Sequence, residues 1–143
     1  MTLFETKRDN YREAVKVIFD RIPIHRFFDI RLENIELGKV TALLKKRPEL
    51  LQQNGYFQAG ALVTLADAVG GAAAYTLTAE GENILSVNFA VALMRPAAAE
   101  KLRGEGWVVK AGKNLYFCET AVYDAADPER KPLMTAAVTL MVV

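Results

Sequence analysis

The sequence predicts an α+β domain in which an antiparallel sheet wraps around one buried helix. Two observations favour this class: two strand-like segments precede, and four follow, a long apolar stretch over residues 58–79. A helix that is apolar on every side has to be covered on every side, and a curved sheet can do this. With 143 residues, 52% of them hydrophobic, the chain predicts one domain over 1–143 with a single core.

The first element expected is an amphipathic helix over residues 4–22. Charged residues fill one of its faces, and Pro23 ends the pattern. Its apolar positions recur at three-four spacing: Tyr11, Ala14, Val15, Ile18, Phe19 and Ile22. Residues 27–46 then predict two strands around a turn at residues 37–39, and Pro48 ends the second strand.

The central element is a helix over residues 58–79. From Leu50 through Ala79 the only charged residue is Asp67. A membrane span is the alternative, but the stretch is built largely from alanine and glycine. An Asp at the centre of a lipid-facing helix also costs about 2.5–3.5 kcal/mol. The better interpretation is a buried helix of a soluble protein.

Four strands are expected after this helix, over residues 84–93, 102–110, 115–123 and 133–143, separated by turn signals. In the first of them, strict alternation places apolar residues on one face and small ones on the other. The small face holds Ser86, Asn88, Ala90 and Ala92. Together with the alanine-rich helix, this face predicts close approach of another element.

Composition excludes several function classes. The net charge of +1 gives no basis for nucleic acid or an anionic membrane as the main partner. A single cysteine, Cys118, excludes an internal disulfide, and one histidine leaves few ligands for a metal site, so none is expected. The N-terminal residues are charged and lack an apolar secretory core, which predicts a cytoplasmic protein. We expect Cys118 to be buried or half-buried, and His25 to lie outside the site in a structural or surface role.

Asp67 is the first candidate for chemistry. An ionised carboxylate in an apolar helix needs a hydrogen-bonding partner or a raised pKa, and either condition suits a general base or a nucleophile. A structural Asp that bonds to the backbone or faces a second subunit remains the alternative.

The loop over residues 52–60 is the second candidate, because the first amides of a helix lack intrahelical acceptors and can bind an oxyanion. Gln58 precedes Asp67 by nine residues, which is about 13 Å along a helix. Both side chains therefore cannot reach one substrate atom within a single subunit. From this spacing alone, Gln58 is better interpreted as a polar residue at the helix entry.

The segment GYFQAGALVTLADAVGGAAA, residues 55–74, resembles the motif of hotdog-fold thioesterases of the phenylacetyl-CoA thioesterase-like branch. Those enzymes carry Gly-x-x-His-Gly-Gly, and Leu-Ala-Asp or Leu-Ala-Glu ending nine residues after the His. Residues 35–38, 86–97 and 110–114 resemble the family's first turn, central strand and basic turn. The resemblance implies a hotdog fold and hydrolysis of an acyl-CoA or acyl-carrier-protein thioester without a cofactor.

Carried over position by position, the resemblance implies that Asp67 is the general base or nucleophile. It places Gln52 near the attacking water and Ser86 as a strand hydroxyl that holds this water. The amides of Ala59 or Gly60 match the family's oxyanion donors. The resemblance also implies a homodimer or a dimer of dimers, in which Asp67 acts across subunits from the Gln58 loop.

The sequence departs from the family at two positions: Gln58 stands where the family has His, and Ala59 where it has the first Gly. Glutamine can orient a thioester by hydrogen bonding but cannot shuttle a proton. The family's thiolate leaving group reduces the need for an acid. A non-catalytic acyl-CoA or lipid-binding hotdog dimer is therefore the alternative function, and a hotdog dehydratase is a poorer third.

The substrate-binding candidates form two groups. The basic residues that match family strand ends, where CoA phosphates bind, are Arg95, Lys110 and Lys113; a solvated face is the alternative for each. The remaining candidates are Asn54, Gly55, Tyr56, Phe57 and Asn88. Of these, Tyr56 and Phe57 either pack in the core or line an acyl pocket.

Overall fold

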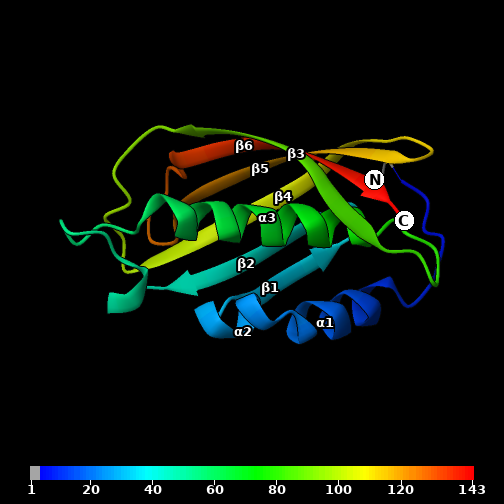
Figure 1. The fold of residues 1–143 in the computed structure, drawn as a ribbon, viewed down its shortest axis with the longest axis horizontal. Coiled ribbons are helices and arrows are strands. Elements are labelled where there is room, and N and C mark those ends of the chain that lie inside the picture. Colours follow the sequence, from blue (N-terminus) through cyan, green and yellow to red (C-terminus); the bar gives the residue numbers. More distant parts are fainter. Residues whose placement is uncertain (1–3) are drawn as a thin grey trace.

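The computed structural model describes residues 4–143 as a six-stranded antiparallel sheet wrapped around a central helix, α3 (Ala59–Tyr75) (Figure 1). The strands are β1 (Arg31–Glu36), β2 (Lys39–Lys45), β3 (Ile84–Leu93), β4 (Lys101–Ala111), β5 (Leu115–Asp124) and β6 (Pro132–Val142). Their order in the sheet is β1-β2-β4-β5-β6-β3, and every pairing is antiparallel. The predicted α+β class and hotdog arrangement are confirmed.

The N-terminal segment differs from its prediction. It forms two helices, α1 (Tyr11–Arg21) and α2 (Pro23–Phe28), so the first helix begins at Tyr11 and not at residue 4. Pro23 occupies the first turn of α2, where a missing amide proton costs nothing. Because α2 takes up Phe28 and ends at Asp29 with a left-handed φ of 60°, the first strand starts at Arg31 and not at residue 27. A short 3₁₀ turn, η1 (Pro48–Leu50), was not predicted.

The sheet approaches α3 closely because β4 carries glycine where the two elements touch. A Cβ at Gly106 would lie 2.5 Å from the backbone of Val69, and one at Gly104 would lie 2.7 Å from Leu65. Ten residues of α3 are buried. Cys118 is also buried, as predicted, and burial raises the pKa of its thiol to about 12. None of the helices formed by residues 4–143 has the length and apolar character needed to cross a membrane.

Strand β3 lies at one edge of the sheet, and its register contains an irregularity. Ser86 pairs with Leu140 of β6, but Asn88 pairs with the adjacent Thr139, so Val87 is the additional residue of a β-bulge. Leu140 is buried toward α3, and paired residues share a face of the sheet. Ser86 therefore points toward α3, whereas Asn88 points to the outer face. The prediction that both lie on one face is wrong, because it assumed uninterrupted alternation.

Candidate active site

A pocket of about 430 Å³ lies between the N-terminal helices, α3 and the start of β3. Asp67, Ser86 and His25 all line it. Apolar side chains form most of the remaining wall, including Ile18, Phe19, Ile22, Ile24, Leu85 and Leu140. An apolar cavity with a few polar groups on its wall is the usual form of a small-molecule site.

The central contact of the pocket joins Ser86 and Asp67. The hydroxyl of Ser86 donates a hydrogen bond of 2.8 Å to Oδ1 of Asp67. The β-bulge at Val87 makes this contact possible, because it turns Ser86 to the side of the strand that faces α3. The expectation that Asp67 has a hydrogen-bonding partner is confirmed, and that partner is a predicted site residue.

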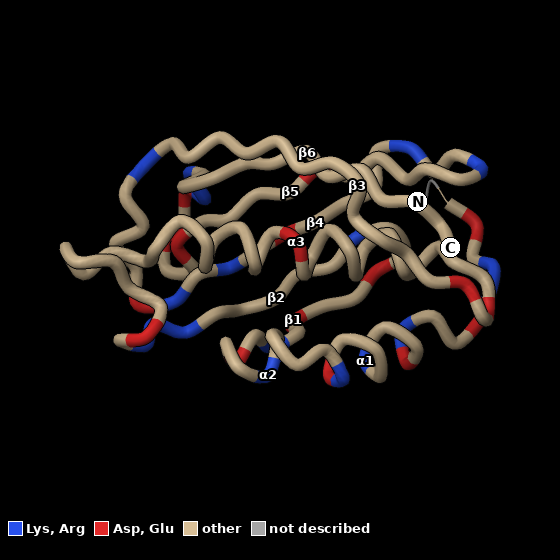
Figure 2. The backbone as a smooth tube through the Cα atoms, in the orientation of Figure 1, with Lys and Arg blue, Asp and Glu red and all other residues tan. Residues whose placement is uncertain are grey.

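Asp67 is nevertheless exposed within the single chain, although its neighbours Ala66 and Ala68 are buried. The helix is therefore covered along most of its surface but open at the pocket. In Figure 2, α3 is tan except for the acidic position along its length. The carboxylate reaches water, substrate or a second subunit without any movement of the helix.

His25 has a structural role, as expected, but it does not lie outside the candidate site. It is buried, with 7% exposure, and it lines the same pocket as Asp67. Its Nδ1–H donates a 3.1 Å hydrogen bond to the carbonyl of Phe19, which fixes the neutral tautomer with Nε2 unprotonated. Burial lowers the pKa of His25, while the Phe19 carbonyl and the negative charges of Asp67 and Asp20 oppose that shift.

At the other end of α3, Gln58 is the helix N-cap. Its side chain accepts a 2.6 Å hydrogen bond from the amide of Gly60. The amide of Ala61 donates to the Gln58 carbonyl, which leaves the amide of Ala59 with no acceptor among residues 4–143. The interpretation of Gln58 as a helix-entry residue is confirmed, and of the two predicted oxyanion donors only Ala59 is free.

The loop before α3 is closed on itself. The Gln52 side chain accepts hydrogen bonds from the amides of Asn54 and Tyr56. Gly55 has a φ of +83°, which allows this tight turn. Asn54, Gly55 and Tyr56 are exposed, whereas Phe57 is buried at 4% exposure in the core. Phe57 is thus a packing residue and does not line the pocket that holds Asp67.

The three basic candidates do not gather at one place. Strand register puts the start of β3 beside the end of β6 and the start of β5, so Lys110 and Lys113 lie at that end of the sheet. Arg95 follows the opposite end of β3, and its guanidinium donates to the carbonyl of Pro132. Ten residues of strand separate the two ends, or about 33 Å at 3.3 Å per residue. They cannot hold one phosphate group within a single chain.

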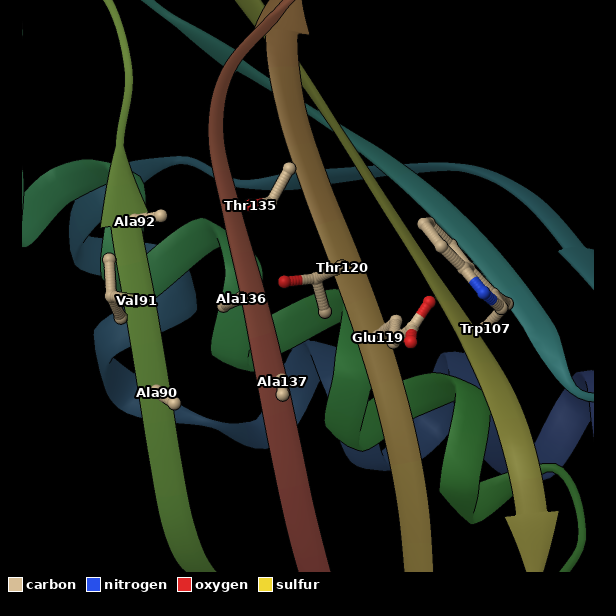
Figure 3. A pocket seen from close by; sticks show the side chains of 9 residues that line it. All are labelled: Ala90, Val91, Ala92, Trp107, Glu119, Thr120, Thr135, Ala136 and Ala137. Carbon is tan, nitrogen blue, oxygen red and sulfur yellow. The ribbon is translucent and has the colours of Figure 1, made fainter.

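A second hollow, of about 480 Å³, lies across β3, β6, β5 and β4 (Figure 3). Trp107, Glu119, Ala137 and Ala90 form one cross-strand row of it. Glu119 is its only ionisable lining residue, and none of the predicted catalytic residues lines it. With a single carboxylate and no second ionisable group beside it among residues 4–143, this hollow is not a site for acid–base chemistry.

The structure therefore brings together Asp67, Ser86 and the unexpected His25, and keeps Gln52, Gln58, Ala59 and Gly60 apart from them at the start of α3. Asn88 is directed to the outer face and stands apart from both groups. The lone histidine carried no sequence signal for a role in the pocket, because its position depends on the break between α1 and α2.

Comparison with known proteins places the chain among thioesterases. The model of the thioesterase superfamily matches residues 54–130, which is more than half of the chain. A thioesterase family protein of Silicibacter pomeroyi is 30% identical, with a TM-score of 0.89 over 93% of this chain and 98% of that one. A phenylacetic acid degradation-related protein of Ralstonia eutropha has a TM-score of 0.80 at 18% identity, over 93% and 99% of the two chains. A Thermoplasma volcanium protein is 32% identical over 92 residues, 64% of this chain and 68% of that protein.

Proposed function

The chain belongs to the thioesterase superfamily, and from this premise we propose that it hydrolyses an acyl-CoA thioester with Asp67 as the general base. The observation that carries the proposal is the hydrogen bond from Ser86 to Asp67 at the mouth of an apolar pocket. A carboxylate with one oxygen held and the other open can orient and deprotonate a water molecule. The surrounding apolar wall suits the acyl part of a thioester.

In the proposed reaction, a water molecule bonds to the free oxygen of Asp67 and to the Ser86 hydroxyl. Asp67 accepts a proton as the water oxygen forms a bond to the thioester carbonyl carbon. The C–S bond then breaks as the tetrahedral intermediate collapses, and the thiolate takes up the proton that Asp67 had accepted. A carboxylic acid and free CoA are released, and Asp67 is again ionised. A thiolate is a good enough leaving group that the absence of a histidine at position 58 does not stop the reaction.

The oxyanion of the tetrahedral intermediate needs a donor, and the amide of Ala59 is the available one. Since Gln58 lies about 13 Å from Asp67 along α3 of the same chain, we propose that a second subunit supplies this amide. The exposed apolar edge strand supports a dimer: Leu85, Val87 and Leu93 of β3 are 57%, 51% and 55% exposed. An unpaired apolar edge is a ready surface for strand pairing between copies.

The first experiment is release of free thiol from a panel of acyl-CoA and acyl-carrier-protein thioesters. Hydrolysis by the wild type, lost in Asp67→Asn, supports the proposal. Binding of acyl-CoA without turnover would instead support the alternative, a non-catalytic acyl-CoA or lipid-binding dimer.

The second experiment tests the shared site by mixing two inactive variants. Asp67→Asn removes the base, and Ala59→Pro removes the amide proposed as the oxyanion donor, at the first helical position, where proline is tolerated. If base and oxyanion donor come from different subunits, the mixed dimer regains one intact site and activity returns.

Sedimentation at low micromolar concentration should give at least twice 15.8 kDa. A monomer, or no regain on mixing, would contradict the shared site.

A further inference from the structure

The pocket that holds Asp67 extends along α3 beyond the carboxylate. Asp67, Gly71 and Tyr75 line it at successive helix turns. With a rise of 1.5 Å per residue, Gly71 lies about 6 Å and Tyr75 about 12 Å from Asp67 along the helix axis. This direction leads away from Gln58, so the pocket begins at the carboxylate and continues on the side opposite to the start of α3.

The remaining wall of this pocket suits an apolar chain. Ile18, Phe19 and Ile22 of the N-terminal segment line it together with Ala68 and Ala72 of α3. Among the described residues, none that lines the pocket is Lys or Arg, and its only carboxylate is Asp67. A negatively charged group inside would therefore have neither a Lys nor an Arg to pair with, and it would be repelled by Asp67.

Gly71 has a special position in this wall. A Cβ built on it would meet only Cδ2 of Leu140, at 3.9 Å, which is ordinary contact distance. The adjacent Gly70 faces the sheet, where a Cβ would lie 3.1 Å from Cγ2 of Thr120. The absence of a side chain at Gly71 thus keeps the middle of the pocket open. The absence of a side chain at Gly70 lets the helix pack against the sheet.

Resting on the proposed thioesterase function, we propose that this pocket binds the acyl group of the substrate, with Gly71 setting the length that is accepted. The thioester carbonyl lies at Asp67, and the acyl chain runs past Gly71 toward Tyr75. The substrates are thioesters of uncharged aliphatic acids of medium length. Acyl groups that end in a carboxylate are excluded.

The test compares hydrolysis of acetyl-, octanoyl- and succinyl-CoA by the wild type, Gly71→Ala and Gly71→Val. The wild type should prefer octanoyl-CoA to both others. A change of one methylene in an apolar pocket alters kcat/KM by about 10-fold or more. Gly71→Val should therefore reduce the octanoyl-to-acetyl ratio, that is, kcat/KM for octanoyl-CoA divided by kcat/KM for acetyl-CoA, by at least that factor. Gly71→Ala should reduce this ratio less than Gly71→Val does.

Gly70→Ala is the matched control, because it adds the same methyl group one position away, toward the sheet. Its octanoyl-to-acetyl ratio should equal that of the wild type. An unchanged ratio in Gly71→Val, or a wild-type preference for succinyl-CoA, would overturn the assignment of the pocket while leaving thioester hydrolysis intact.

A binding measurement separates failure of this inference from failure of the proposed function. The probe is the thioether analogue of octanoyl-CoA, which cannot be hydrolysed, and the readout is calorimetric titration. If the wild type binds the analogue and Gly71→Val binds it at least 10-fold more weakly, the assignment of the pocket is supported, even if the wild type turns over no thioester. Absent binding, or equal binding by both proteins, overturns it.

Discussion

The hydroxyl of Ser86 lies 2.8 Å from Oδ1 of Asp67, although the two residues are 19 positions apart in the chain. Ser86 reaches the carboxylate because Val87 is inserted as a bulge in β3. Without the bulge, Ser86 and Asn88 would lie on the same face of the strand. Bulges are used in this way next to active sites, where they redirect one side chain while the rest of the strand keeps its pairing.

Asp67→Asn should lower acyl-CoA hydrolysis by about 10²- to 10⁴-fold, the usual contribution of a general base. The amide oxygen of Asn can still accept the hydrogen bond from Ser86, so folding should be preserved. The measurement is kcat/KM on the best substrate together with the thermal midpoint. If the variant keeps most of its activity, Asp67 has a structural role and the chemistry lies elsewhere.

Ser86→Ala should reduce kcat/KM by about 10- to 150-fold, because hydrogen bonds to charged groups contribute about 1.5–3 kcal/mol. Ser86→Thr keeps the hydroxyl and should retain more activity than the alanine variant. Asn88→Ala is the control on the opposite face of β3, and its kcat/KM should stay near that of the wild type. A larger loss in Asn88→Ala than in Ser86→Ala would show that the outer face carries the substrate.

Sequence patterns predicted most of the fold because each pattern follows from burial. The uncharged stretch around Asp67 indicated a covered helix, and the order of one helix, two strands, one helix and four strands followed from periodicity. The break between α1 and α2 was not visible, since Pro23 fits both the end of one helix and the first turn of the next.

The candidate site was only partly accessible to the same reasoning. The motif around Asp67 indicated the carboxylate as a candidate, and the resemblance added Ser86. The face of Ser86 relative to Asn88 was wrong, because a bulge leaves no mark in an alternating sequence. His25 was missed since its place in the pocket of Asp67 is produced by tertiary packing of the N-terminal helices beside α3, to which local spacing gives no access.

Gln58→Ala should destabilise the protein by about 0.5–2 kcal/mol, the cost of losing a helix N-cap. The reason is the hydrogen bond that the Gln58 side chain accepts from the amide of Gly60. Gln58→Asn is the matched variant, because a shorter amide is a good N-cap, and it should recover most of the stability. Urea unfolding measures both. Equal stability of Gln58→Ala and the wild type would show that the cap contributes nothing in solution.

His25 should make both the stability and the activity of the protein depend on pH below about 6.5, the usual pKa of a histidine. Its pKa in the folded protein is lowered, chiefly by burial, whereas the unfolded chain titrates near the usual value of about 6.5. The unfolded state therefore binds a proton at a pH where the folded state does not. The stability of the folded state is complete above about 6.5 and is lost as the pH falls through the lowered pKa.

The measurement is urea unfolding at a series of pH values, with His25→Gln as the comparison, since its amide can still donate to the Phe19 carbonyl. The variant should lose the part of the pH dependence that develops below about 6.5.

In Asp67→Asn the negative charge that opposes the shift is gone, so NMR titration of His25 should give a still lower pKa. Activity of the wild type should also fall in this window, because a charged imidazole in the pocket draws Asp67 away from the attacking water. A wild-type pH profile identical to that of His25→Gln in both stability and kcat/KM would show that His25 does not titrate in the pocket.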